Sequence, residues 1–139
     1  MSPDCFRDTN VLFYAAMARF SAPQKHRQAR RIIAENNFAV SGQVLQEFYV
    51  NVTRKFDKPL TSEQAVGWLS RLIDRPCAAV DHDLVVRGAE IANRYKISYW
   101  DGAILAGAER VSAPILYTED LNDGQTYGSV RAVNPFKTH

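Results

Sequence analysis

Residues 6–15 read FRDTNVLFYA, and they place one carboxylate, Asp8, between a short apolar run and a longer one. The short run before Asp8 has the length and apolar character of a buried strand, whereas the longer run after it suits a helix. In an open α/β sheet, ligands bind beyond the carboxyl ends of the strands. This stretch therefore predicts that a strand ends at Asp8, at the edge where such a fold builds its sites.

The rest of the chain alternates short apolar runs with longer periodic segments. The expected strands, each about 3–5 residues long, are Cys5–Phe6, Phe38–Val40, Cys77–Val80, Ile115–Tyr117 and Val130–Val133. One helix is expected after Asp8, one beginning near Pro23 and one after Ser41. A further helix should run from Thr61 to before Pro76, and two more should span about Asp83–Tyr95 and Tyr99–Val111. This alternation predicts an α/β fold, with a mostly parallel sheet of about five short strands covered by helices on both faces.

The composition suits one folded domain over residues 1–139, because 46% of the 139 residues are hydrophobic. No apolar run approaches the roughly 18 residues of a membrane span, and the N-terminal residues lack a signal-peptide pattern, so we expect a cytoplasmic protein. The net charge of +2 neither requires nor excludes a polyanionic partner. Cys5 and Cys77 are expected to be small buried hydrophobic residues rather than a disulfide or a zinc site.

Three further carboxylates lie at comparable positions in separate segments. Asp120 follows the strand Ile115–Tyr117, as Asp8 follows the first strand. Glu47 falls on the flank of the apolar stripe of its helix, so it borders the core without belonging to it. Asp101 lies in the first turn of a helix whose N-terminus faces the strand ends.

Each of these acids also has a purely structural explanation. Asp8 could cap the helix that follows it, and Asp101 could be a favourable charge in a first helical turn. Glu47 could be a solvated helix residue and Asp120 a turn former. Taken together, four carboxylates from four distant segments on one edge repel one another unless a cation lies between them. Since no Cys or His lies in these segments, the sequence favours magnesium or manganese over zinc.

The motifs around these acids, in order, resemble the PIN domain. They are DTNVLFYA, SGQVLQEFY, SYWDGAILAGA and LYTEDLNDGQ, followed by a closing VNPF. The resemblance covers nearly the whole chain. In its compact size and in its C-terminal motifs, the chain is similar to VapC-type toxins of bacterial and archaeal toxin–antitoxin pairs. It implies a PIN-like three-layer sandwich and a ribonuclease that hydrolyses RNA phosphodiester bonds with Mg²⁺ or Mn²⁺.

Carried over by position, the resemblance also implies a set of functional residues. The acidic catalytic site would be Asp8, Glu47, Asp101 and Asp120, with metal at Asp8, Asp101 and Asp120 and with Asn10 and Thr118 in support. Asp123 is either a fifth acid or part of an Asp-Gly turn with Gly124, and Glu119 is expected to point outwards. Two residues depart from the family pattern: Arg7 replaces an apolar residue, which suggests a partly exposed strand or a nearby ion pair, and Gly102 replaces a common alanine.

The expected partners are RNA, a cognate antitoxin and a second copy of the chain. Basic side chains that could hold RNA phosphates are Lys25, Arg27, Arg30, Arg31, Arg54 and Lys55, although each could equally belong to a solvated helix face. A base could stack on an aromatic residue near the acids, but we expect Trp100 to lie in the core. The apolar helices between Glu47 and Trp68 favour a homodimer.

Other functions need residues that this chain lacks. A haloacid-dehalogenase phosphatase requires a second Asp two residues after the first, where Asn10 stands. A receiver-like magnesium-binding module, which is not an enzyme, requires a lysine at a late strand end, where Thr118, Glu119 and Asp120 stand. An RNA-processing PIN nuclease without an antitoxin and a non-catalytic magnesium-binding module remain open as alternatives.

Overall fold

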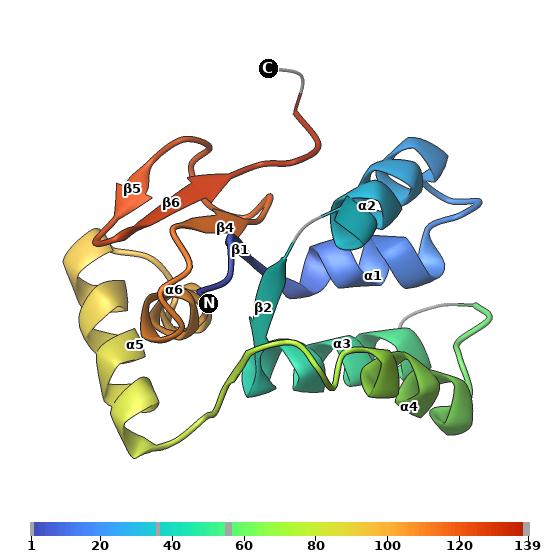
Figure 1. Ribbon diagram of the computed structural model, residues 1–139, viewed down its shortest axis with the longest axis horizontal. Helices are drawn as coiled ribbons and strands as arrows, with labels where there is room; N and C mark the ends of the chain where they lie inside the picture. Colours follow the sequence, from blue (N-terminus) through green and yellow to red (C-terminus); the bar gives the residue numbers. More distant parts are fainter. Residues whose placement is uncertain (1, 36, 55–56, 138–139) are drawn as a thin grey trace.

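The computed structural model describes residues 2–35, 37–54 and 57–137, which form a sheet with helices on both faces (Figure 1). The strands are β1 (Cys5–Arg7), β2 (Phe38–Ser41), β3 (Cys77–Ala78), β4 (Ile115–Tyr117), β5 (Thr126–Tyr127) and β6 (Val130–Val133). The helices are α1 (Thr9–Met17), α2 (Pro23–Glu35), α3 (Gly42–Arg54), α4 (Ser62–Arg71), α5 (His82–Tyr95) and α6 (Tyr99–Arg110). The predicted α/β class is therefore confirmed.

The strand order β3-β2-β1-β4-β6-β5 puts β1 near the centre of the sheet. All neighbouring strands are parallel except β5, which runs antiparallel to β6. The chain builds outward from β1 through β2 to β3 and then returns to the opposite side of β1 as β4. The order of strands thus reverses between β1 and β4, and such a switch point is where open α/β sheets bind their ligands.

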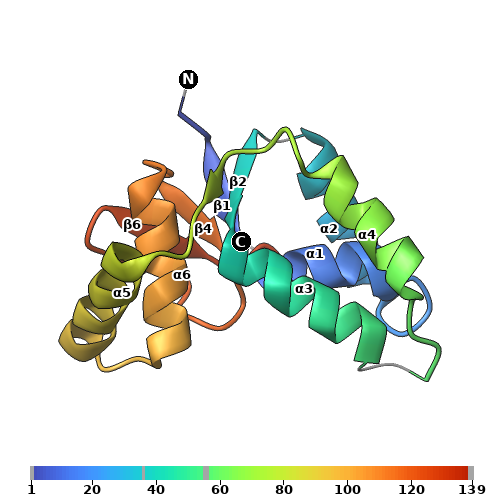
Figure 2. The same ribbon diagram turned by 90° about the horizontal axis from the view of Figure 1, so that it is seen from below.

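Two groups of helices cover the sheet. Helices α1 to α4 lie on one side, and α6 lies on the other with α5 packed outside it (Figures 1 and 2). The core between these layers is apolar, and Phe6, Phe38, Phe48 and Leu116 are fully buried there. This is the three-layer arrangement expected from the sequence. Across the described ranges, no helix is both long enough and apolar enough to cross a membrane.

Local sequence signals explain where several helices begin. Thr61 caps α4 through a capping box in which its hydroxyl accepts from the backbone N–H of Gln64, whose side chain accepts from the N–H of Thr61. Asp81 caps α5, and Ser98 caps α6 by accepting from the Asp101 N–H at 3.1 Å. Such caps satisfy backbone N–H groups that have no partner within the helix.

Helices α5 and α6 pack unusually closely because each carries a glycine at the crossing. A Cβ built on Gly102 of α6 would overlap the carbonyl oxygen of Gly88 and also crowd Ala92. A Cβ on Gly88 would in turn lie 2.9 Å from the Cα of Ala103. The glycine that departs from the family pattern at position 102 is therefore explained by its fit against α5.

Arg7 is the clearest difference between expectation and structure in the sheet. We expected a partly exposed strand or an ion pair, but the Arg7 side chain is fully buried because β1 is a central strand. Its guanidinium stacks on the Tyr117 ring at 4.4 Å and donates to the Ile32 carbonyl at 3.1 Å. Within the described residues, Nε and Nη1 have no hydrogen-bond partner, and burial lowers the Arg7 pKa to about 10.

Two smaller expectations are also corrected. Cys5 is buried as expected, but Cys77 is exposed, since the outermost strand β3 leaves it beside an open hollow. The strand expected over Cys77–Val80 ends at Ala78, and β5, which had no clear sequence signal, adds a sixth strand by pairing with β6. Gly124 before β5 and Gly128 after it both have positive φ angles, which glycine tolerates best.

Candidate active site

The four predicted acids come from the ends of β1 and β4 and from helices α3 and α6, around the switch point of the sheet. Asp8 directly follows β1, and its backbone N–H donates to the Tyr117 carbonyl of β4 at 3.2 Å. This bond brings the residues after β1 next to those after β4. Asp8, Glu47 and Asp120 line one pocket of about 320 Å³, together with Thr9, Asn10, Phe13, Tyr14 and Asn51.

Asp8 is both a helix cap and the most deeply buried acid of the pocket. Its Oδ1 accepts from the Thr9 N–H at 2.6 Å, which starts α1, and its Oδ2 accepts from the Thr118 hydroxyl at 2.6 Å. With only 6% of Asp8 exposed, burial raises its pKa to about 7, and the charges of Asp120 and Glu47 add to this rise. The capping explanation therefore holds, and the same carboxylate also lines the pocket.

Glu47 is held from two directions in the middle of α3. The Thr9 hydroxyl donates to its Oε2 at 2.8 Å, and the Gln43 amide donates to its Oε1 at 3.0 Å. The same Gln43 nitrogen also donates to the Trp100 carbonyl at 3.2 Å. Gln43 is thus a positioning residue that sequence reasoning missed, because a glutamine one turn before an acid has no distinctive sequence signal.

Asp120 is positioned by the two polar residues expected to support the site. The Asp120 N–H donates to the Thr118 hydroxyl oxygen at 3.1 Å, and the Asn10 amide donates to Asp120 Oδ2 at 3.4 Å. Burial raises the Asp120 pKa most, and the neighbouring charges of Asp101 and Glu119 raise it further. Thr118 therefore ties Asp8 and Asp120 together through one hydroxyl.

Asp101 lies at the start of α6, where Ser98 caps the helix. Burial is the main reason that its pKa is raised, and the charge of Glu47 contributes in the same direction. Asp101 in turn raises the pKa of Asp120, so all four acids interact electrostatically. We expected repulsion to raise these pKa values, but for Asp8, Asp101 and Asp120 loss of solvent is the larger cause and repulsion the smaller one.

The donor chemistry of the pocket fits a hard divalent cation. Its polar atoms are carboxylate, hydroxyl and amide oxygens, which magnesium and manganese prefer. Among residues 2–35, 37–54 and 57–137, no three His, Cys, Asp or Glu side chains stand close enough to form a complete ligand set. This is compatible with magnesium, which usually binds through one or two carboxylates and keeps several waters.

Two other acids near the pocket have partners of their own. Glu119 accepts from the Tyr14 hydroxyl at 2.6 Å and from the Lys25 ammonium at 2.9 Å. Its carboxylate is therefore turned away from the four acids. It was expected to point outwards, but it contacts these two side chains instead of pointing freely into solvent. The Oδ1 of Asp123 accepts from the Asn134 N–H at 2.8 Å. Asp123 thus holds the turn before Gly124 to the residues after β6, as the structural alternative predicted.

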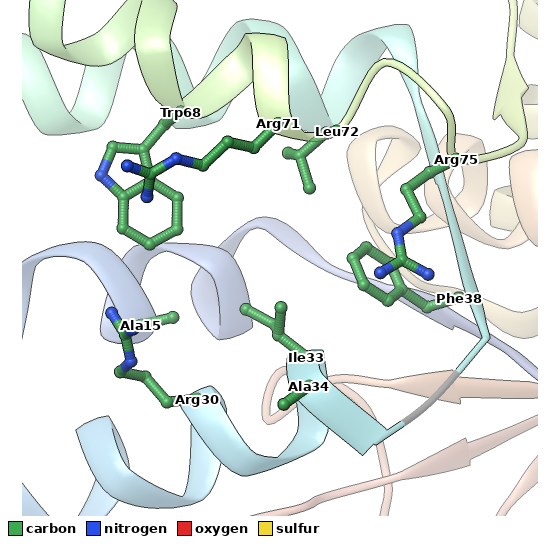
Figure 3. Close-up of a pocket in the computed structure, with 9 residues that line it drawn as sticks. All are labelled: Ala15, Arg30, Ile33, Ala34, Phe38, Trp68, Arg71, Leu72 and Arg75. Carbon is green, nitrogen blue, oxygen red and sulfur yellow. The ribbon is translucent and has the colours of Figure 1, made fainter.

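The predicted RNA-binding residues differ in how available they are. Lys25 is half-buried beside Glu119, while Arg27, Arg31 and Arg54 are exposed. Lys55 lies outside the described residues. Arg30 lines a second cavity of about 200 Å³, which is bounded by Ala15, Ile33, Ala34, Phe38, Trp68, Arg71, Leu72 and Arg75 (Figure 3).

This second cavity is aromatic and cationic. Arg30 comes from α2 and Arg71 from α4, and Arg75 follows α4 (Figure 3). Arg71 lies over the Trp68 ring at 5.4 Å, and Arg75 lies over the Phe38 ring at 4.3 Å. None of the three arginines forms a salt bridge with a described residue.

Trp100 is not in the core, contrary to expectation. Its side chain is 64% exposed at the start of α6, beside Asp101. Helix α6 buries the consecutive residues Gly102 to Ala108, so it is covered on all sides from Gly102 onward. Trp100 lies in the first turn, before this covered stretch begins, and its side chain reaches solvent there.

Comparison with known proteins identifies the family. The PIN domain model matches residues 5–123, and the chain belongs to this family. The fold is similar to a crystal structure of Mycobacterium tuberculosis VapC20, described as a sarcin-ricin loop cleaving toxin. That likeness has a TM-score of 0.66 and 20% identity, and it covers 84% of this chain and 89% of VapC20.

Two structures of complexes show the same fold. A toxin–antitoxin complex from Klebsiella pneumoniae matches with a TM-score of 0.68 and 22% identity, over 96% of this chain and 99% of the other. VapBC2 from Rickettsia felis, bound to a DNA fragment from its promoter, matches with a TM-score of 0.61 and 19% identity, over 92% and 96%. No curated protein sequence matches the chain.

Proposed function

We propose that this chain is a metal-dependent endoribonuclease that acts as the toxin of a toxin–antitoxin pair. The observation that carries the proposal is the electrostatic cluster of Asp8, Glu47, Asp101 and Asp120, drawn from four separate segments of a PIN-family fold. Clustered carboxylates with raised pKa values are typical of functional sites. The toxin role is supported by the solved structures of similar fold, which include a toxin and two toxin–antitoxin complexes.

The residues that would hold Mg²⁺ or Mn²⁺ are Asp8, Asp101 and Asp120, with Glu47 acting directly or through water. When bound, the ion supplies a polarised water to attack the phosphodiester and positive charge to offset that on the leaving oxygen. Near neutral pH the metal-free Asp8 exchanges a proton, since its pKa is about 7. A bound cation would favour the charged form of the Asp8 carboxylate.

The chain's own residues prepare the carboxylates before the substrate arrives. Thr118 donates to Asp8 and accepts from the backbone of Asp120, so it holds both acids at a fixed separation. Thr9 links Asp8 to Glu47, because its N–H and its hydroxyl donate to one acid each. Groups held in this way need little rearrangement during the reaction, which is how preorganised sites lower a barrier.

Basic residues outside the acidic pocket are proposed to contact RNA phosphates. Arg27, Arg31 and Arg54 are exposed and can do so without losing a partner. Lys25 is less available, because Glu119 neutralises its ammonium. Arg30 is better suited to the cavity that it shares with Arg71 and Arg75, which we assign to the antitoxin.

An antitoxin segment that carries carboxylate and aromatic side chains would suit the cavity of Figure 3. Three guanidinium groups surround it, and the partly buried Trp68 supplies an apolar ring. Arg71→Glu should therefore abolish co-purification with the product of the adjacent reading frame, whereas Arg27→Glu, on the exposed side of α2, should not. Equal binding by both variants would contradict this assignment.

A homodimer is supported by a second apolar surface beside the edge strand β3. A hollow of about 360 Å³ there is lined largely by Leu45, Val66, Leu69, Ile73 and Cys77. Ile73 in this lining is 81% exposed, and an exposed apolar surface to which several side chains contribute is typical of a protein-interaction site. Sedimentation at micromolar concentration should show a dimer that Ile73→Asp dissociates, and a monomeric wild type would contradict this.

The test of the toxin role is expression in bacterial cells. The wild-type chain should arrest growth and fragment cellular RNA, and co-expression of the adjacent small reading frame should relieve the arrest. Asp8→Asn should be harmless at the same expression level. Growth arrest by Asp8→Asn, or no arrest by the wild type, would contradict the proposal.

A further inference from the structure

Trp100 is an exposed tryptophan directly before Asp101, one of the four acids. Its side chain is 64% exposed, and it makes a T-shaped contact with the Tyr99 ring, with ring centroids 5.1 Å apart and planes at 75°. One such contact can cover at most one face of the indole. A single exposed apolar residue requires no explanation by itself. Its anchoring and its neighbours point to a ligand.

The backbone of Trp100 is fixed on both sides. Its carbonyl accepts from the Gln43 amide on α3 at 3.2 Å, and Ser98 caps the helix turn in which it lies. Two residues later, Gly102 packs against Gly88 with no room for a Cβ, which locks α6 to α5. The ring is therefore presented to solvent from one of the more constrained backbones in the molecule.

The same contacts connect Trp100 to the four acids. Asp101 is the next residue, and its carboxylate interacts with Glu47 and Asp120. The Gln43 nitrogen that holds the Trp100 carbonyl also holds Glu47. The backbone of Trp100 is thus held beside the cluster that would bind the scissile phosphate, and its indole is exposed.

The chemistry of the substrate matches this position. In single-stranded RNA each phosphate lies next to a nucleobase with two open aromatic faces, and proteins commonly stack such bases on Trp, Tyr or Phe. The pocket itself is acidic, so it attracts RNA only through a bound cation. An uncharged stacking contact beside it adds affinity that the acids do not oppose.

We infer that Trp100 stacks on a nucleobase adjacent to the scissile phosphate, and that it selects single-stranded RNA. This inference rests on the proposed ribonuclease function, since it names the substrate class of the same site. Stacking does not depend on the identity of the base, because every base has a π-face. Trp100 therefore contributes affinity for unpaired nucleotides rather than a cleavage sequence.

The experiment measures binding separately from cleavage. The chain has two tryptophans, so Trp68→Phe leaves Trp100 as the only indole reporter. Combined with Asp8→Asn to prevent turnover, this protein is titrated in Mg²⁺ with a short unstructured RNA and with an abasic ribose-phosphate oligomer of equal length. The RNA should quench Trp100 fluorescence, and the abasic oligomer should not.

Substitution at position 100 then tests the contact itself. In the Asp8→Asn background, which keeps Asp101 and Asp120 for a more weakly held Mg²⁺, Trp100→Ala should weaken RNA binding about 5- to 150-fold, and Trp100→Phe should recover most of the loss. Binding of the abasic oligomer should be the same for all three proteins. The inference would be overturned if Trp100→Ala weakened the binding of both ligands equally or left RNA binding unchanged. It would also be overturned if Trp100→Ala changed the sedimentation of the protein, because Trp100 would then mark a contact between copies of the chain.

The two proposals can fail independently. If the wild type cleaves RNA in Mg²⁺ but Trp100→Ala has unchanged KM and kcat, stacking is wrong and the ribonuclease function stands. If no cleavage occurs but RNA still quenches Trp100 and Trp100→Ala binds it weakly, the ribonuclease function is wrong and RNA stacking stands.

Discussion

Replacing Asp8 with asparagine removes the carboxyl group whose pKa burial raises to about 7, so it should change how the stability of the metal-free protein depends on pH. In the unfolded chain this pKa returns to its ordinary value of 3.8. The folded state then binds the proton more tightly, so the group favours folding below pH 3.8 and loses this contribution as the pH rises through 7. A rise of about three pKa units at about 1.4 kcal/mol each corresponds to about 4 kcal/mol.

The assay is urea unfolding in EDTA between pH 5 and 8.5, with wild type and Asp8→Asn compared at each pH. Near pH 5 part of the 4 kcal/mol has already been lost, so the two proteins should diverge by roughly 2–3 kcal/mol over this range, with Asp8→Asn gaining relative to wild type as the pH rises. Asparagine still caps α1, so loss of the cap does not obscure the comparison. Added Mg²⁺ should stabilise the wild type above pH 7 and should stabilise Asp8→Asn less. Parallel pH profiles for the two proteins would refute the argument that Asp8 is a buried group held by its surroundings with a raised pKa.

Three further substitutions test the packing around the site. Gly102→Ala should destabilise the protein by about 1–3 kcal/mol, since the new Cβ would overlap Gly88. As a control, Gly67→Ala should stabilise it by about 0.5–1 kcal/mol, because a Cβ there meets nothing within 4 Å. Equal urea midpoints for the two variants would contradict the close helix crossing. Arg7→Met should unfold at no lower urea concentration than wild type, because two guanidinium nitrogens of Arg7 lack partners among the described residues. A loss of more than about 3 kcal/mol in the free energy of unfolding would reveal a partner. Glu119→Gln should lower the free energy of unfolding, measured by thermal melting, by less than about 1.5 kcal/mol, since the ion pair of Glu119 is partly exposed. A larger loss would mean that Glu119 is a main support of α1.

Much of the fold could be predicted from the sequence because its signals are local. The Thr61 capping box, the Ser98 cap and the short apolar runs each depend on neighbouring residues, and α4, α6, β4 and β6 begin where these signals place them. β5 was missed because its pairing with β6 follows from the turn geometry at Gly124 and Gly128 rather than from an apolar run.

Placement of single side chains was less predictable, because it depends on tertiary packing. Arg7 follows an apolar run and could not be recognised as a residue of a central strand until the strand order was known. Trp100 was expected in the core, but it lies in the first turn of α6, before the buried stretch of that helix, and is exposed. Asp8, Asp101 and Asp120 could be selected from the sequence because each stands at a strand end or in a first helical turn, and Glu47 because it flanks the apolar stripe of its helix. Gln43, which only contacts Glu47 and Trp100, could not.

The measurement that tests the central claim most directly compares two neighbouring acids in an RNA cleavage assay. Asp120 lies in the acidic pocket and Glu119 points away from it to Lys25 and Tyr14, so Asp120→Asn and Glu119→Gln each remove one negative charge from the same loop. The wild type should cleave unstructured RNA in Mg²⁺ and stop in EDTA, Glu119→Gln should retain this activity, and Asp120→Asn should lose about 100-fold or more. Cleavage that persists in EDTA, or equal activity of the two variants, would contradict a metal-dependent site built from Asp8, Glu47, Asp101 and Asp120.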